Sequence, residues 1–180
     1  MEEAVSRYSA ALVSIAKDEG KLEQYKFAVL SIQETFNLNP ELLKYLKSYF
    51  VSEEDKNKVI DELTRDFKLK NLTNFLKLLV AKHKIFLFKD IAKEITKDIN
   101  FELDIYEGFV YSTEPLQKAK IDEISQVISK KIGKKIELKN NLDERLIGGV
   151  KVVVHDHVFD GSVKYKLETL KEQLKERRNG

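Results

Sequence analysis

Glycine and proline are scarce in this chain, and their scarcity constrains the fold more than any other feature. Together they account for 9 of 180 residues, about 5% against an average near 12%. Sandwiches and barrels of many strands need turn residues at every chain reversal, whereas helices need them mainly at their ends. The composition therefore predicts a mainly α-helical protein. The absence of cysteine also excludes disulfides, thiolate metal sites and cysteine nucleophiles.

The charges are numerous but nearly balanced. Lysine and arginine total 32 and the acidic residues total 30, which gives a net charge of +2. Such a mixture is typical of solvated helix faces, and it argues against nucleic acid as a partner. The first three residues, Met-Glu-Glu, do not begin a signal peptide, and no stretch approaches the roughly 18 apolar residues of a membrane span. We expect a cytosolic chain, or one held at a membrane only through partners.

Apolar residues recur at spacings of three and four along the first 105 residues, which is the pattern of amphipathic helices. Short breaks marked by Gly20, Asn39-Pro40, Ser52 and Asn71 separate the helical segments. The pattern predicts a six-helix bundle over residues 1–105, with helices near 2–16, 22–36, 40–46, 53–67, 71–81 and 87–105.

The pattern changes after residue 105. A β-rich stretch at 108–113 precedes a helical stretch at 116–132, and alternating residues at 136–140 and 150–154 predict two further strands. Gly148-Gly149 breaks the chain between these strands, and Ser162 is placed to cap a last helix whose apolar stripe runs from Val163 to Leu174. Residues 106–180 are therefore predicted to form a small α+β domain.

The chain offers little for catalysis or metal binding. His155 and His157 would share one face of a strand, but zinc and catalytic iron usually need three or four protein ligands. We therefore interpret this segment as a polar hairpin turn; the alternative is a metal-dependent enzyme in which both histidines bind the metal. No Gly-x-Ser-x-Gly motif is present. We expect no enzymatic activity, no cofactor and no metal.

The first and fifth helices carry more apolar residues than one buried face requires. Residues 10–13 are consecutively apolar, and residues 75–81 are nearly so. A surplus of this kind favours a surface that accepts a partner helix. The alternative is that the fifth helix is central and buried on all sides.

Several motifs at consistent spacing resemble one family across nearly the whole chain. They are Arg-Tyr-Ser-Ala-Ala-Leu at 7–12, Asn-Phe-Leu-Lys-Leu-Leu at 74–79, Asp-Glu-Arg-Leu-Ile-Gly-Gly-Val at 143–150 and Asp-Gly-Ser-Val at 160–163. This pattern is similar to that of the delta subunit of F-type ATP synthases, the bacterial counterpart of the mitochondrial oligomycin-sensitivity-conferring protein. Three residues depart from the family pattern: Ser9 replaces a common Ala, Lys84 a common Arg, and His155 the Gly that usually precedes Asp156.

The resemblance implies a non-catalytic stator subunit, without cofactor, that joins the catalytic head of the ATP synthase to the peripheral stalk. In the family, the helical domain binds the N-terminal helix of an alpha subunit between its first and fifth helices, and the C-terminal domain meets subunit b. Carried onto this chain, the alpha-binding residues are Tyr8, Ala11, Ile15, Asn74 and Leu78. The resemblance also implies a peripheral location at the cytoplasmic face of the bacterial plasma membrane.

Two segments, 143–149 and 160–162, are interpreted as structural elements of the C-terminal domain: a turn between strands and the cap of the last helix. Their residues are Asp143, Leu146, Ile147, Gly148, Gly149, Asp160, Gly161 and Ser162. The alternative to a stator subunit is a free-standing helical adaptor that binds an amphipathic partner helix. Such an adaptor would not need these segments at this spacing.

Overall fold

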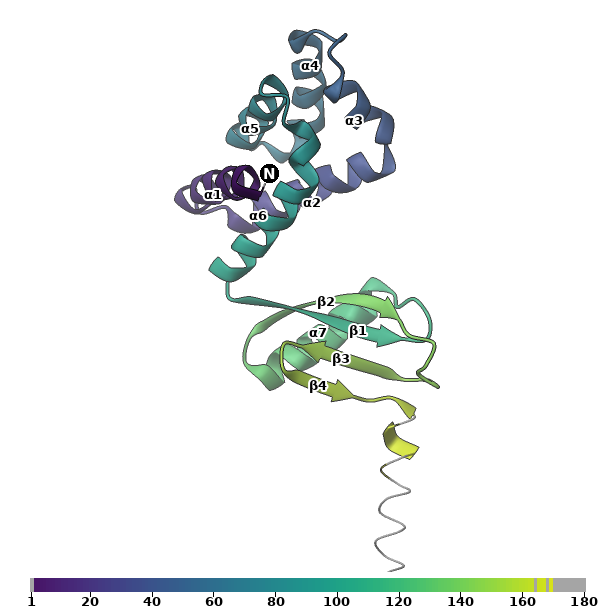
Figure 1. The fold of residues 1–180 in the computed structure, drawn as a ribbon. Helices are drawn as coiled ribbons and strands as arrows, with labels where there is room; N and C mark the ends of the chain where they lie inside the picture. Colours follow the sequence, from purple (N-terminus) through teal and green to yellow (C-terminus); the bar gives the residue numbers. More distant parts are fainter. Residues whose placement is uncertain (1, 164, 168, 170–180) are drawn as a thin grey trace, which may run out of the picture. The chain divides into compact units, whose positions relative to one another are not determined.

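A computed structural model describes residues 2–163, 165–167 and 169. The chain divides into two compact units, Met1–Leu103 and Asp104–Gly180, which are described separately. The first unit is helical, and the second contains a small sheet (Figure 1). The protein is therefore mainly helical with a small α+β part at its C-terminal end. None of the helices in the described residues is long and apolar enough to cross a membrane.

The described residues of the first unit form six α-helices and two short 3-10 helices. The elements are α1 (Glu2–Asp18), α2 (Leu22–Leu38), α3 (Pro40–Lys47), α4 (Glu53–Thr64), η1 (Arg65–Phe67), α5 (Lys70–Ala81), η2 (Ile85–Leu87) and α6 (Phe88–Glu102). The expected six-helix bundle is thus too simple a description. The chain tightens into 3-10 turns after α4 and before α6, as it often does at helix ends.

The core of the first unit lies where α1 and α2 pack against α6. Among its buried side chains, Phe36 and Phe88 meet edge to face with ring centroids 5.4 Å apart. Ser9, one of the departures from the pattern of the family that the sequence resembles, is also fully buried. Its hydroxyl donates a hydrogen bond of 2.9 Å to Asp98 on α6, so the additional polar atom is satisfied inside the core.

The start of α5 differs from the sequence expectation. The sequence pattern places Asn71 at the break before this helix, as a residue suited to an N-cap, but the helix begins at Lys70. Leu69 occupies the N-cap position without a side-chain hydrogen bond. The Asn71 amide instead donates to the Glu19 carboxylate at 2.7 Å. The Asn71 side chain therefore links α5 to the carboxylate just beyond the end of α1. In α4, by contrast, Ser52 accepts from the Asp55 N–H at 3.1 Å.

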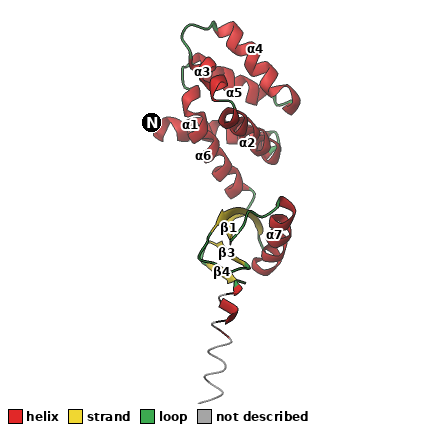
Figure 2. Ribbon diagram, turned by 90° about the vertical axis from the view of Figure 1, so that its right-hand side faces the viewer, coloured by secondary structure: helices red, strands yellow, loops and turns green. Residues whose placement is uncertain are grey.

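The second unit is a four-stranded mixed sheet with one helix. Its elements are β1 (Ile105–Ser112), α7 (Lys118–Ile132), β2 (Lys135–Leu142), β3 (Val150–Val154) and β4 (His157–Asp160), with the strands in the order β2-β1-β3-β4. β1 and β2 run parallel, which requires the crossover that α7 provides. Figure 2 shows α7 along one face of the sheet, where Val110, Ile128, Ile136, Val152 and Val154 form the core.

β4 was not expected as a strand. His155 and Asp156 form the two-residue turn, and His157 begins a strand that pairs antiparallel with β3. His155 adopts a left-handed backbone conformation with φ of 48°, the conformation for which the family's glycine is suited. Its ring packs against Tyr106 with centroids 4.7 Å apart. The sequence pattern did not predict this strand, because β4 lies at the sheet edge, where side chains need not be apolar.

Candidate partner-binding surface on α1 and α5

α1 and α5 are neighbours in the first unit, and one aromatic contact joins them. The ring of Tyr8 on α1 meets the ring of Phe75 on α5 edge to face, with centroids 6.2 Å apart. Phe75 is buried and Tyr8 is half-buried, so part of the Tyr8 side chain faces solvent. The guanidinium of Arg7 lies 5.9 Å from the centre of the Tyr8 ring. Tyr8 is thus anchored in the fold while remaining accessible.

α5 has a buried face and an exposed face. Its buried residues are Leu72, Phe75, Leu76, Leu79 and Val80. Leu78 is 44% exposed, and Asn74, one turn earlier on the same side of the helix, is also exposed. The hypothesis that the fifth helix is buried on all sides is therefore wrong.

On α1 the structure divides the apolar run at residues 10–13. Leu12 and Val13 are buried in the core, whereas Ala10 and Ala11 are exposed. The surplus of apolar surface on this helix is thus smaller than the sequence suggested. Ile15, one turn after Ala11, is half-buried and packs against the core. We call Tyr8, Ala11, Ile15, Asn74 and Leu78 the α1/α5 surface.

A hydrogen-bonded group beyond the end of α1 holds the two helices together, and sequence reasoning did not identify it. Glu19 accepts hydrogen bonds from Asn71 on α5 and, at 3.1 Å, from the hydroxyl of Tyr25 on α2. Lys21 pairs with the same carboxylate at 3.3 Å. The hydrogen bond from Asn71 is the main reason that the pKa of Glu19 lies below its usual value. Burial and the Glu19 hydrogen bond raise the pKa of Tyr25.

The α1/α5 surface has the chemistry of a binding surface. It presents an aromatic ring, aliphatic side chains and one amide, but no nucleophile paired with a base. Among the described residues, no group of three or more His, Asp or Glu side chains is placed to hold a metal ion. His155 and His157 have separate aromatic neighbours, since His157 stacks near Phe159 with centroids 6.3 Å apart.

Asp143 and Arg145 organise the segment between β2 and β3. The Asp143 carboxylate accepts from Arg145 Nε at 2.8 Å, from Nη2 at 3.0 Å and from the Arg145 backbone N–H at 3.1 Å. These hydrogen bonds lower the pKa of Asp143. Leu146 is buried close by in the sequence, whereas the side chain of Ile147 is exposed. Of the two large apolar side chains in the predicted structural set, Leu146 is therefore buried and Ile147 faces solvent.

Gly149 lies where two backbone segments approach closely. Its φ is 77°, and a Cβ atom there would lie 2.6 Å from the Gly161 carbonyl oxygen and 3.0 Å from the Ser162 Cα. The Gly161 N–H donates to the Val150 carbonyl at 2.9 Å, and the Val163 N–H donates to the Gly148 carbonyl at the same distance. The segments 148–150 and 161–163 are therefore held together by backbone hydrogen bonds.

Ser162 lies at the start of the last helix. Its hydroxyl accepts from the Tyr165 N–H at 3.2 Å, and its own N–H donates to Asp160 Oδ1 at 3.0 Å. The first hydrogen bond is that of an N-cap. Leu170 and Leu174 of the predicted apolar stripe lie outside the described residues.

The chain is similar to known proteins over almost its whole length. The family described as ATP synthase delta (OSCP) subunit matches residues 4–174. ATP synthase subunit delta of Mycoplasma mycoides is 37% identical over 176 residues, which cover 96% of this chain and 97% of that protein. The subunit of the same name from Halalkalibacterium halodurans is 30% identical over 171 residues, covering 94% and 93% of the two chains.

A solved structure supports the fold. A chain from the cryo-EM structure of the Toxoplasma gondii mitochondrial ATP synthase hexamer matches with a TM-score of 0.61 and 21% identity. The match covers 94% of this chain and 96% of that chain. The family match and the bacterial relatives place the chain in the ATP synthase delta (OSCP) subunit family.

Proposed function

We propose that this chain is a non-catalytic stator subunit of the proton-translocating F-type ATP synthase. It joins the catalytic head to subunit b of the peripheral stalk, so that the head does not turn with the rotor. Membership of the family and the names of the bacterial relatives support this assignment. The function requires stable binding and no chemistry, which agrees with the character of the α1/α5 surface.

The exposure of Leu78 on α5, the helix whose Phe75 contacts Tyr8, is the observation that carries the proposed contact with the head. The N-terminal helix of an alpha subunit would lay its apolar face against Tyr8, Ala11, Ile15 and Leu78, and Asn74 would offer its amide for hydrogen bonding. Burial of the exposed 44% of Leu78, on the order of 80 Å², would contribute about 2 kcal/mol. Tyr8 and Leu78 should therefore dominate the affinity.

The second unit would contact the end of subunit b. The protein would then reach the membrane only through the assembled complex, at the cytoplasmic face of the bacterial plasma membrane. This location agrees with helices that do not span a membrane in the described residues. Nucleic acid is not proposed as a partner, because the net charge is only +2.

Calorimetric titration with a synthetic N-terminal helix of the cognate alpha subunit tests the proposed contact. The wild-type chain should bind the peptide one to one. Leu78→Glu should abolish binding, since loss of about 2 kcal/mol already weakens it roughly thirtyfold and the new carboxylate would be buried unpaired. Leu30→Glu is the matched control, because Leu30 is 42% exposed in α2 and lies outside the α1/α5 surface.

The outcomes separate the possible explanations. Normal helicity with loss of binding in Leu78→Glu alone supports the proposal. Loss of helicity in this variant would mean that Leu78 belongs to the core, and the assignment of the α1/α5 surface would be wrong. Equal loss of binding in both variants would show that the peptide responds to added charge and not to this surface.

A further inference from the structure

Two loops at one end of the first unit carry exposed aromatic side chains and lysines. The first, residues 47–51, runs from the last residue of α3 towards α4, and the second, residues 82–86, follows α5 and enters η2. Tyr49 is 79% exposed, Phe50 is fully exposed and Phe86 is 44% exposed. The loops are in contact, because the ring of Tyr49 lies 4.8 Å from that of His83. We call residues 47–51 and 82–86 the loop surface.

The backbone of the first loop is fixed by hydrogen bonds. The Lys56 ammonium donates to the Ser48 carbonyl at 2.5 Å, and the Phe50 N–H donates to the Ser48 hydroxyl at 3.2 Å. Leu46, immediately before the loop, is buried. Tyr49 and Phe50 are therefore held outward by an ordered loop, which reduces the entropy lost when a partner covers them.

The second loop is fixed by the end of α5. The His83 N–H donates to the Val80 carbonyl at 2.9 Å, the Lys84 N–H donates to the Leu79 carbonyl at 2.7 Å, and His83 has a φ of 52°. Ile85 and Leu87 are buried on either side of Phe86. Phe86 thus faces solvent because both of its neighbours are anchored in the core.

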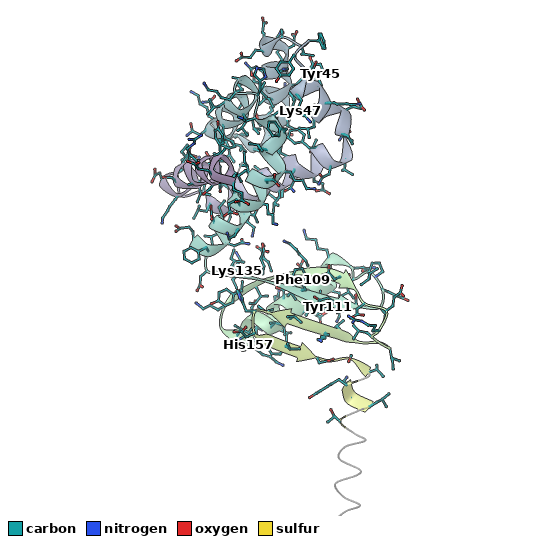
Figure 3. The ribbon with its side chains drawn as sticks, viewed as in Figure 1. Tyr45, Lys47, Phe109, Tyr111, Lys135 and His157 are labelled. Atoms are coloured by element: carbon teal, nitrogen blue, oxygen red, sulfur yellow. The ribbon has the colours of Figure 1, made fainter. Side chains whose placement is uncertain are left out.

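The charge of the loop surface has one sign. Its ten residues include three lysines, Lys47, Lys82 and Lys84, and no acidic residue; Figure 3 shows Lys47 at the end of α3. Within the described part of the chain, none of these lysines forms an ion pair, although Lys84 lies 5.9 Å from the ring of Phe86. The three aromatic side chains expose on the order of 400 Å², the size of patches that mark interaction sites.

We infer that the loop surface binds an acidic protein segment that carries large apolar side chains. The aromatic rings would contact its apolar residues, and the three lysines would face its carboxylates. The exposed Glu53, Glu54 and Asp55 follow the first loop. A membrane is an extended anionic surface and would face these carboxylates as well, whereas a short acidic segment can contact the three lysines alone. The inference goes beyond the proposed alpha contact and does not depend on it.

Amide chemical shifts of the full-length, isotope-labelled chain provide the test. The probe is a short synthetic peptide in which glutamates flank a Leu-Phe pair, compared with a peptide that has lysine in place of each glutamate. The acidic peptide should shift the amide resonances of the loop surface. The combined variant Tyr49→Ser, Phe50→Ser should weaken its binding by about tenfold, whereas Phe101→Ser, at a residue 85% exposed on α6, should not.

Reversal of charge provides a second variant that keeps the aromatic side chains. The variant that combines Lys47→Glu with Lys84→Glu should bind the basic peptide more tightly than the acidic peptide. Absence of shifts at the loop surface, or equal binding of both peptides by the wild-type chain, would overturn the inference. Binding to vesicles of anionic phospholipid in place of the acidic peptide would overturn it as well and would identify a lipid site.

Discussion

Gly149 and Gly133 allow two costs of adding a Cβ atom to be measured separately: the steric cost of a close backbone approach and the conformational cost of a positive φ. Both have a φ of 77°, but a Cβ at Gly133 would meet no atom within 4 Å, whereas one at Gly149 would lie 2.6 Å from the Gly161 carbonyl oxygen. A residue with a Cβ in this conformation costs roughly 1–2 kcal/mol. Replacing glycine by alanine also lowers the conformational entropy of the unfolded chain, which offsets about 0.5 kcal/mol of this cost. Gly133→Ala should therefore destabilise the second unit by about 1 kcal/mol.

Gly149→Ala carries the same conformational cost and an additional steric one. The atoms in its way belong to the backbone of Gly161 and Ser162, which cannot move without disturbing the hydrogen bond from the Gly161 N–H to the Val150 carbonyl. Overpacking of this kind costs typically 1–3 kcal/mol. We expect a total of about 3 kcal/mol, close to 2 kcal/mol more than for Gly133→Ala.

Amide hydrogen exchange in the full-length chain measures this difference within the second unit. The buried strand residues Val110 and Val152 should exchange only when the unit opens. Their exchange should accelerate by about fivefold in Gly133→Ala and about a hundredfold in Gly149→Ala. Equal acceleration in the two variants would refute the reasoning, because it would show that the close approach at Gly149 carries no energy of its own.

Two further predictions concern the hydrogen bonds at helix ends. The pKa of Glu19 is lowered in the folded protein, so the stability contributed by its ionised form is present near neutral pH and is lost as the pH falls through the acid range. Urea unfolding should show that Glu19→Gln is less stable than wild type at pH 7 and nearly equal to it at pH 3. Removal of a capping hydroxyl should destabilise the unit that contains it by about 1 kcal/mol. Ser52→Ala should therefore destabilise the first unit, and Ser162→Ala the second. Exchange rates assigned to each unit check the second prediction, and a loss in the wrong unit would contradict it.

The local elements of this fold follow from sequence periodicity. The apolar spacing located the helices of the first unit, and the alternation at residues 136–140 and 150–154 located two of the strands. These patterns identify helices and strands because each element buries one face, regardless of which other element packs against that face. The general organisation, helices first and then a small α+β part, could therefore be predicted before any contact was known.

The contacts between elements could not be predicted in the same way. Asn71 is of a residue type that is preferred at helix N-caps, but its amide donates to Glu19, a residue 52 positions away. Gly149 was expected as a simple turn residue, yet a carbonyl 12 residues later also restricts it. On α1, Leu12 is buried and Ala11 exposed, a division set by α6 and not by the residues themselves. Such choices depend on tertiary neighbours, which a local pattern does not contain.

Leu78 and Leu79 allow the proposed binding role of α5 and its role in the core to be tested separately. Leu79 is fully buried in the core, whereas its neighbour Leu78 is 44% exposed, because successive residues of a helix point about 100° apart. Leu79→Ala should lower the free energy of unfolding of the first unit by about 3 kcal/mol but leave the affinity of the folded protein for the alpha peptide nearly unchanged. Leu78→Ala should do the reverse. Urea unfolding followed by calorimetry on each variant measures both quantities. If Leu79→Ala weakened the peptide affinity as much as Leu78→Ala, the buried face of α5 would be part of the binding site, and the α1/α5 surface as defined would be wrong.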